Sequence, residues 1–165
     1  MKLRYSVILL KNNAILLFFI SLPRSIQKAK AMELENSTND YRPLILVAED
    51  DESNFKLIKA IIGKKCEIMW AKNGEEIVSL FKENREKAEA ILMDIKMPIM
   101  NGLDATEHIR QEEKRLPIIM QTAYAFTADR ERALECGASE VLVKPITMNA
   151  LRTCLSRYLP KLMWQ

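Results

Sequence analysis

The sequence predicts an α/β domain in which helices cover both faces of a parallel sheet. From Pro43 onward, short apolar runs alternate with segments whose apolar residues follow helical spacing, and this alternation is typical of parallel sheets. The run Ala90–Met93 contains no polar residue, which indicates a strand buried on both faces. The chain of 165 residues, 48% hydrophobic and 28% charged, is long enough for one domain with a substantial core.

The other elements follow from apolar runs, caps and stops. Besides Ala90–Met93, strands are expected at 44–48, 66–71, 117–122 and 140–143. Helices are expected to start at Ser53, Asn73-Gly74, Leu103, Thr127 and Thr147, because Ser, Thr and Asn are good N-caps. Gly63 and Gly137 are expected to end helices. Asp94 is expected to be the first residue of a loop.

Residues 1–31 differ in composition from the rest of the chain. They contain six basic and no acidic residues, and 14–22 is an apolar run of nine residues, whereas a membrane-spanning helix needs about 20. We favour the interpretation that residues 1–31 lie upstream of a natural start at Met32 or are left over from a longer chain. A peripheral membrane anchor and a signal peptide stay open. We expect a non-core segment at 1–42, a core domain at 43–160 and a tail at 161–165.

The composition argues against several classes of function. Residues 32–165 contain 19 basic and 22 acidic residues, so we expect no nucleic-acid binding. The three cysteines are odd in number and far apart, which favours buried thiols in the reducing cytoplasm over disulfides. The single histidine, His108, has no neighbours that suggest nucleophilic catalysis.

Polar residues follow the strands at one end of the expected sheet. Glu49 and Asp50 follow the first strand, Asp94 the third, Thr122 ends the fourth, and Lys144 follows the fifth. Because parallel strands point the same way, these groups are expected to meet at one edge, where such sheets bind ligands. Crowded carboxylates need a cation, and oxygen ligands without His or Cys favour a hard ion such as Mg²⁺.

This pattern is suited to phosphoryl transfer. A carboxylate can attack phosphorus and form an acyl phosphate. The metal, Lys144 and the hydroxyl group of Thr122 can stabilise the charge on the phosphoryl oxygens.

Four motifs together resemble the receiver domains of response regulators. The motifs are Glu49-Asp50, residues 92–102 (LMDIKMPIMNG), Thr122-Ala123 and Lys144-Pro145. The resemblance covers about residues 43–159, and residues 121–125 (QTAYA) are most similar to receivers of hybrid sensor histidine kinases. It implies a flavodoxin-like, doubly wound sheet with strand order 2-1-3-4-5.

The resemblance implies a nucleophile and a metal site. Asp94 would accept a phosphoryl group from the phosphohistidine of a histidine kinase or histidine phosphotransfer domain. Asp50, Asp94 and the backbone carbonyl of Lys96 would bind Mg²⁺ directly. Glu49 would act through water, although the family usually has Asp at this position.

The resemblance also implies phosphate contacts and a docking face. Thr122, the backbone N–H of Ala123, and Lys144 would bind the phosphoryl oxygens, and the Lys144–Pro145 bond would be cis. A downstream protein would dock on residues 127–159.

One departure concerns the signalling step. Val141 replaces the aromatic residue that usually takes part in the family's switch, so the loop after Thr122, with Tyr124, or a change in surface charge would have to transmit the signal. Lys96 and Tyr124 are expected to flank the path of the attacking water and to slow loss of the phosphate.

Several functions stay open. The chain is either a stand-alone receiver or part of a hybrid kinase, and its only expected catalysis is its own phosphorylation and dephosphorylation. A degenerate receiver that acts as a phosphorylation-independent interaction module is the alternative. An aspartyl-nucleophile phosphatase is disfavoured, because Lys96 stands where such enzymes need a second Asp.

Overall fold

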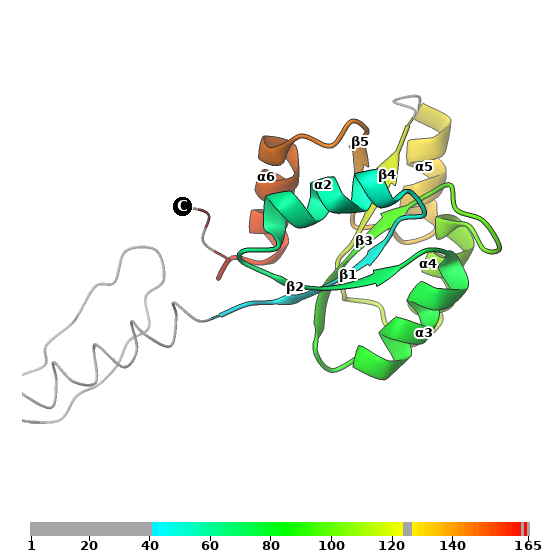
Figure 1. Ribbon diagram of the computed structural model, residues 1–165. Coiled ribbons are helices and arrows are strands. Elements are labelled where there is room, and N and C mark those ends of the chain that lie inside the picture. Colours follow the sequence, from blue (N-terminus) through cyan, green and yellow to red (C-terminus); the bar gives the residue numbers. More distant parts are fainter. Residues whose placement is uncertain (1–40, 124–126, 163, 165) are drawn as a thin grey trace, which may run out of the picture. The chain divides into compact units, whose positions relative to one another are not determined.

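The computed structural model describes residues 41–123, 127–162 and 164. The predictions for residues 1–31 and for Tyr124 fall outside this part of the chain. Within it, five strands form one parallel sheet in the order β2-β1-β3-β4-β5 (Figure 1), which confirms the predicted fold class and strand order. The strands are β1 (Leu44–Ala48), β2 (Glu67–Ala71), β3 (Ala88–Asp94), β4 (Ile118–Thr122) and β5 (Glu140–Val143).

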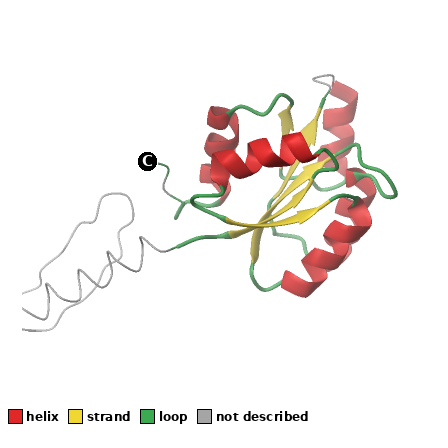
Figure 2. Ribbon diagram, viewed as in Figure 1, coloured by secondary structure: helices red, strands yellow, loops and turns green. Residues whose placement is uncertain are grey.

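Helices cover the sheet on both faces (Figure 2). The helices of the described residues are α2 (Glu52–Ile62), α3 (Gly74–Asn84), α4 (Gly102–Glu112), α5 (Thr127–Glu135) and α6 (Met148–Tyr158). Buried side chains of α3, α4 and α5 join one core cluster, and those of α2 and α6 join the other. The sheet therefore separates two hydrophobic layers, as a doubly wound fold requires.

The central strands form the most buried part of the domain. Every residue of β1 and β4 is buried, as are all residues of β3 except Glu89, whereas the edge strands β2 and β5 are partly exposed. Side chains alternate between the two layers: Ile91 and Met93 join one cluster, and Ala90 and Leu92 join the other. Strands buried on both faces explain the continuous apolar runs in the sequence.

Two helix caps lie where the sequence predicts them, and that of α2 does not. Asn73 and Thr147 cap α3 and α6, whereas α4 is capped by Asn101, two residues before the predicted start at Leu103. The prediction that Ser53 caps α2 is wrong, because Asp51 is the N-cap and its carboxylate accepts a hydrogen bond from the N–H of Asn54 at 2.8 Å. A carboxylate also interacts favourably with the positive end of the helix dipole.

Gly137 ends α5 as predicted. Its φ is +99°, a left-handed conformation that favours glycine. The N–H of Gly137 donates to the carbonyl of Leu134, and the N–H of Ala138 donates to that of Ala133. This pair of bonds is a Schellman motif, which satisfies carbonyls at the helix end.

Strand β3 is longer than predicted. It starts at Ala88 rather than Ala90, and its pairing with β1 shifts by one residue between Ala88 and Ala90, so that Glu89 is extra. The polar Glu89 interrupts the apolar pattern and so hides the start of the strand; its carboxylate accepts a hydrogen bond from the phenol of Tyr41. At the other end, Asp94 is the last strand residue and not the first loop residue.

The residues after α6, predicted to form a tail, also pack on the domain. Leu162 is only 4% exposed and belongs to the core cluster beneath α2 and α6. The indole N–H of Trp164 donates to Ser156 Oγ at 2.9 Å, and the guanidinium of Arg152 lies 5.0 Å from its ring.

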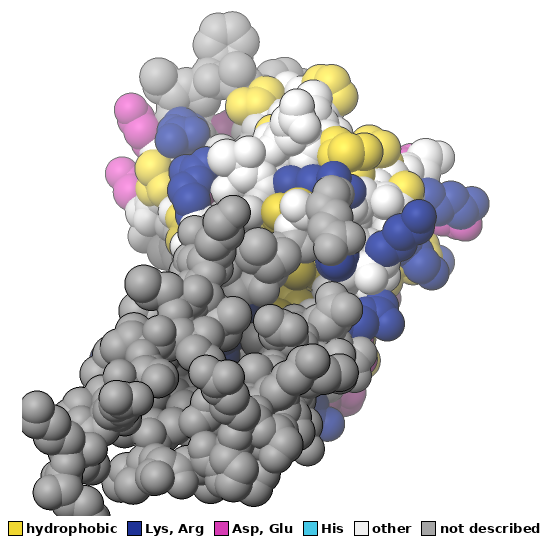
Figure 3. All heavy atoms as spheres, turned by 90° about the vertical axis from the view of Figure 1, so that its left-hand side faces the viewer, with side chains coloured by type: hydrophobic (Ala, Val, Ile, Leu, Met, Phe, Trp, Pro, Cys, Tyr) yellow, Lys and Arg dark blue, Asp and Glu magenta, His cyan; other side chains and the backbone are white. Residues whose placement is uncertain are grey.

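The described surface carries mixed charge. On the face shown in Figure 3, Lys and Arg side chains lie in several separate groups with hydrophobic and uncharged surface between them.

All three cysteines are free; Cys66 and Cys154 are buried, whereas Cys136 is only partly buried. Among the described helices, none has both the length and the apolar composition needed to cross a membrane.

Candidate functional site

Three carboxylates lie together at the carboxyl end of the sheet. Glu49 and Asp50 directly follow β1, and Asp94 ends β3, the neighbouring strand. One oxygen atom from each of the three lies within 4.8 Å of the others. The structure therefore brings together the acidic residues that the sequence places at this edge.

The side chain of Lys144 connects two of these carboxylates. Its Nζ atom lies 2.6 Å from Asp94 Oδ2 and 2.8 Å from Glu49 Oε2. Lys144 follows β5, and its backbone N–H donates to the carbonyl of Thr122 at 2.7 Å, which extends the β4–β5 ladder. The Lys144–Pro145 peptide is cis, as the resemblance implied.

Glu49 is the most enclosed member of the site. It is fully buried, and its other oxygen, Oε1, accepts a hydrogen bond from Asn54 Nδ2 at 3.0 Å. Burial raises the pKa of the Glu49 carboxyl above its usual range, while the hydrogen bonds from Lys144 and Asn54 oppose that rise. Glu49 thus depends on two donors to carry a charge in the interior.

The Lys144 ammonium is held in its charged form. Burial acts to lower its pKa, but the hydrogen bonds to Asp94 and Glu49 and their negative charges outweigh burial, so the pKa is raised. A cation fixed at this point neutralises part of the repulsion between the carboxylates.

The backbone of Asp94 is packed directly against Gly102. A Cβ atom on Gly102 would lie 2.1 Å from the backbone oxygen of Asp94, so only glycine fits there. The N–H of Gly102 donates to the carbonyl of Ile95 at 2.9 Å. The loop between β3 and α4 therefore returns to the residue from which it leaves the sheet.

Other residues named from the sequence lie around this cluster. The backbone N–H of Lys96 makes a long hydrogen bond of 3.3 Å to Asp94 Oδ1, and the Lys96 side chain is exposed. Thr122 is 3% exposed at the end of β4, and Ala123 next to it is exposed. Val141, in β5, is 4% exposed and lies in the core cluster beneath α3, α4 and α5. His108 is exposed on α4.

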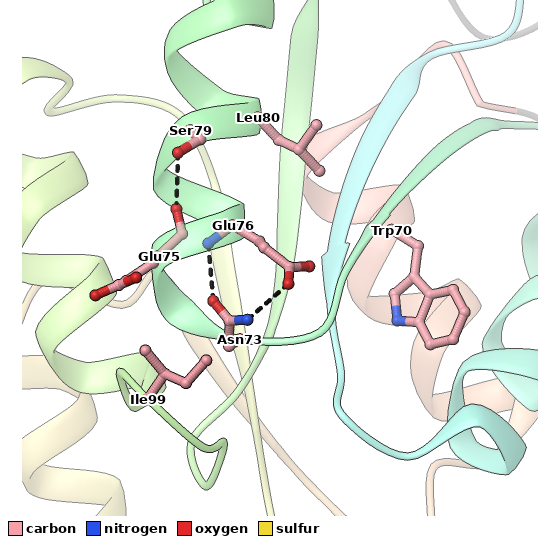
Figure 4. A pocket seen from close by; sticks show the side chains of 7 residues that line it. All are labelled: Trp70, Asn73, Glu75, Glu76, Ser79, Leu80 and Ile99. Atoms are coloured by element: carbon pink, nitrogen blue, oxygen red, sulfur yellow. Dashed lines mark hydrogen bonds between the residues drawn. The ribbon is translucent and has the colours of Figure 1, made fainter.

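A shallow pocket lies beside the start of α3, and none of the three clustered carboxylates lines it. It is lined by Trp70, Asn73, Glu75, Glu76, Ser79, Leu80 and Ile99 (Figure 4). Its polar groups serve mainly to cap α3: Asn73 Oδ1 accepts from the Glu76 N–H at 2.9 Å, and Glu76 Oε2 accepts from the Lys72 N–H at 2.8 Å. This pocket is therefore explained by the local structure of the helix start.

The sequence did not reveal how three further residues shape the site. Asn54 binds Glu49 through its side chain, Trp70 donates its indole N–H to the Glu49 carbonyl at 2.7 Å, and Gly102 supports the backbone of Asp94. Asn54 was detectable in principle, because a residue in the first turn of a helix can reach back to the preceding loop. The contact of Trp70 depends on strand pairing and has no local signal.

The comparison with protein families identifies this arrangement. Residues 45–156 match the response regulator receiver domain. The chain belongs to this family. As a receiver domain it is a component of two-component signal transduction, and the predicted fold and family are both confirmed.

Individual relatives agree. The hybrid signal transduction histidine kinase I of Dictyostelium discoideum is 41% identical over 115 residues, which cover 65% of this chain and 7% of that protein. The chain therefore spans only a small part of the length of that relative. A receiver domain of the sensor histidine kinase PA1611 from Pseudomonas aeruginosa is 32% identical, with a TM-score of 0.66, and the match covers 73% of this chain and 99% of that one.

Another similar structure contains a partner. It is the complex of the histidine phosphotransfer signaling protein Ypd1 of Saccharomyces cerevisiae with the receiver domain of its downstream response regulator Ssk1. The matched chain is 28% identical, with a TM-score of 0.66, and the match covers 71% of this chain and 88% of that one.

The donor atoms of the receiver site suit a hard cation. Glu49, Asp50 and Asp94 offer only carboxylate oxygens. Such oxygens are the preferred ligands of hard cations such as Mg²⁺, whereas softer metals prefer nitrogen or sulfur ligands. Asp50 is exposed, whereas Glu49 and Asp94 are buried, so the cluster opens to solvent on the Asp50 side. The PA1611 receiver holds a magnesium ion in its active site cleft.

Proposed function

We propose that this receiver domain accepts a phosphoryl group on Asp94. The observation that carries the proposal is the contact of Lys144 Nζ with Asp94 Oδ2 at 2.6 Å, beside two further carboxylates. A carboxylate oxygen of Asp94 attacks the phosphorus of a phosphohistidine, the P–N bond breaks, and its electron pair stays on the imidazole. The product is an acyl phosphate on Asp94.

Mg²⁺ is the proposed cofactor. Asp50, Asp94 and the backbone carbonyl of Lys96 would bind it directly, and Glu49 would act through water. When bound, the ion neutralises negative charge on the phosphoryl oxygens. The buried pair Glu49–Lys144 keeps one carboxylate and one ammonium in fixed positions next to Asp94, so little reorganisation is needed when phosphate charge arrives.

The phosphoryl oxygens would contact three groups at the carboxyl ends of two strands. Thr122 ends β4, Ala123 is the first residue of the following loop, and Lys144 follows β5. The hydroxyl of Thr122, the N–H of Ala123 and the Lys144 ammonium would donate to these oxygens. Lys144 would move from the Asp94 carboxylate to the phosphoryl group attached to it, so its positive charge serves both states.

The donor is proposed to be a histidine kinase or a histidine phosphotransfer protein. The relatives support this choice, since one is a hybrid histidine kinase and another is bound to a phosphotransfer protein. The three free thiols fit the reducing cytoplasm, where we place this signalling step.

A downstream protein is proposed to bind the face formed by residues 127–159. Five large hydrophobic side chains of the described residues are exposed, and three of them lie in this range: Leu134, Val143 and Met148. Exposed apolar groups of this kind are common at protein–protein contacts.

A second candidate function follows from Val141. This buried, aliphatic residue occupies the position at which the resemblance to receiver domains implies an aromatic switch residue. A receiver without that switch can act as a phosphorylation-independent interaction module. The phosphorylation experiment described next separates the two functions.

The test is phosphorylation of the full chain by a small-molecule acyl phosphate donor with Mg²⁺, measured by intact-protein mass spectrometry. We expect a mass gain of one phosphoryl group for the native chain, and none in EDTA or for Asp94→Asn. Asp51→Asn is a matched control, because Asp51 caps α2 and lies outside the three-carboxylate cluster. Absence of any gain in the native chain would contradict the proposal and favour the interaction module.

A further inference from the structure

Trp70 connects the edge strand of the sheet to the acidic site. Its indole N–H donates to the backbone carbonyl of Glu49 at 2.7 Å. The N–H of Glu49 donates to the carbonyl of Ala71 at 3.0 Å, in the ladder between β1 and β2. Both backbone groups of Glu49 are therefore held by β2, one through the ladder and one through the Trp70 side chain.

The indole ring is itself held in place. Phe55 stacks on Trp70 with ring centroids 4.1 Å apart and planes inclined by 3°, and the ammonium of Lys72 lies 5.0 Å from the Trp70 ring. Phe55 belongs to α2 and directly follows Asn54, whose amide binds the Glu49 carboxylate.

This arrangement fixes the direction in which Asp50 leaves the sheet. The carbonyl of Glu49 and the N–H of Asp50 belong to one planar peptide group. A hydrogen bond to that carbonyl therefore restricts rotation of the whole peptide and the position of the Asp50 Cα atom. Asp50 is exposed, so its side chain is little restrained by packing, and the position of its carboxylate depends largely on the backbone. Ligands that are already in position lose less conformational entropy when an ion binds.

We propose that Trp70 is a positioning residue of the acidic site and sets its affinity for Mg²⁺, with Phe55 orienting the indole. Trp70 touches neither the metal nor the phosphoryl group in this proposal, and acts through the peptide between Glu49 and Asp50. The inference rests on the proposed function, in which Asp50 binds the metal.

The test is titration of the full chain with Mg²⁺ by isothermal calorimetry. We expect Trp70→Phe to weaken Mg²⁺ binding by roughly three- to tenfold, because the ring is retained but one hydrogen bond is lost. Trp164→Phe is the matched control: Trp164 also donates one indole hydrogen bond, to Ser156 Oγ, and also has a cation 5.0 Å from its ring. Its Mg²⁺ affinity should stay within about twofold of native.

A second variant and a kinetic measurement separate positioning from general damage to the fold. Phe55→Leu keeps the indole N–H but removes the stacked ring, and should weaken Mg²⁺ binding by roughly two- to threefold. For Trp70→Phe, the Mg²⁺ concentration at half-maximal phosphorylation rate should rise in step with the calorimetric constant, while the rate at saturating Mg²⁺ stays near native. If Trp70→Phe fails to fold, as measured by circular dichroism, Phe55→Leu decides the matter.

Two results would overturn this inference but not the proposed function. The first is a native-like Mg²⁺ affinity of Trp70→Phe, or of Phe55→Leu if Trp70→Phe does not fold. The second is a loss of Mg²⁺ affinity in Trp164→Phe equal to that in Trp70→Phe. In both cases the native chain still binds Mg²⁺, so the proposed function survives. A native chain that binds no Mg²⁺ would overturn both.

Discussion

Lys144 Nζ lies 2.6 Å from Asp94 Oδ2 and 2.8 Å from Glu49 Oε2, so one ammonium group stands between two carboxylates from different strands. Lys144 lies beyond β5, two strands away from Asp94 at the end of β3. The side chain therefore reaches across the edge of the sheet, and the charge balance of the site depends on this one residue.

Replacing this cation should make folding stability depend more strongly on pH. We expect Lys144→Met to lower the free energy of unfolding by about 2–4 kcal/mol at pH 7.5 in EDTA, because a buried carboxylate loses its partner. Burial already raises the pKa of Glu49, and losing Lys144 removes the hydrogen bond that opposes this rise.

The sign of the effect follows from the raised pKa. A carboxyl whose pKa is raised on folding contributes stability at low pH and loses that contribution as the pH rises through its folded pKa. The difference between Lys144→Met and native should therefore shrink as the pH is lowered toward about 4.5, the usual pKa of Glu. Urea unfolding at several pH values measures this, and an equal difference at pH 7.5 and 4.5 would count against the account.

Adding a methyl group to Gly102 should disturb Asp94 directly. The Cβ of Gly102→Ala would meet the backbone oxygen of Asp94 at 2.1 Å, so the strand end must shift. We expect a loss of about 1–3 kcal/mol in stability and a phosphorylation rate reduced by roughly tenfold or more.

Gly74→Ala provides the comparison for Gly102→Ala. Its Cβ would also meet a backbone carbonyl of the β3–α4 loop, that of Met100 at 2.6 Å, but it does not contact Asp94. Urea unfolding and phosphorylation rates should show similar destabilisation and a much smaller loss of rate. A larger loss of rate in Gly74→Ala would refute this interpretation.

Arg110 should be important for stability but not for chemistry. Its guanidinium donates to the carbonyls of Gly137, Glu113 and Leu116 at 2.8–3.0 Å and so ties α4 to the turn after α5. Arg110→Met should cost about 2 kcal/mol, because partly buried carbonyls lose their donors. Lys56→Met, which removes a largely exposed ion pair with Glu52, should cost less than about 1 kcal/mol. Thermal unfolding compares them, and equal losses would contradict the assignment.

Lys96 should affect how long the phosphate persists. Its side chain is exposed and its backbone N–H contacts Asp94, so we expect the side chain to flank the route of an attacking water. Lys96→Ala should lose phosphate several-fold faster than native, measured by mass spectrometry after removal of the donor. Unchanged or slower loss would exclude this role, and Lys64→Ala, a lysine in the loop after α2, is a suitable control.

The sequence was sufficient for the frame of the domain and for the ends of its strands. Continuous apolar runs mark β1, β3 and β4 because these strands are buried on both faces. The parallel direction of the strands then places Glu49, Asp94 and Lys144 at one edge, which the structure confirms.

Contacts between distant segments could not be predicted. The start of β3 is hidden because a bulge inserts the polar Glu89 into the pairing with β1. The support of Asp94 by Gly102 and of Glu49 by Trp70 depends on how loops and strands return to the site. The packing of Leu162 on the core is likewise a tertiary effect of a short segment with little local pattern.

Mapping the modified residue tests whether Asp94 is the phosphoacceptor. The phosphorylated full chain is treated with borohydride, which reduces an acyl phosphate on Asp to homoserine, and is then digested and sequenced by tandem mass spectrometry. We expect homoserine at position 94 and unmodified Glu49 and Asp50. Homoserine at position 50, reduction of Glu49, or a phosphoryl group that survives borohydride on His108 would contradict it.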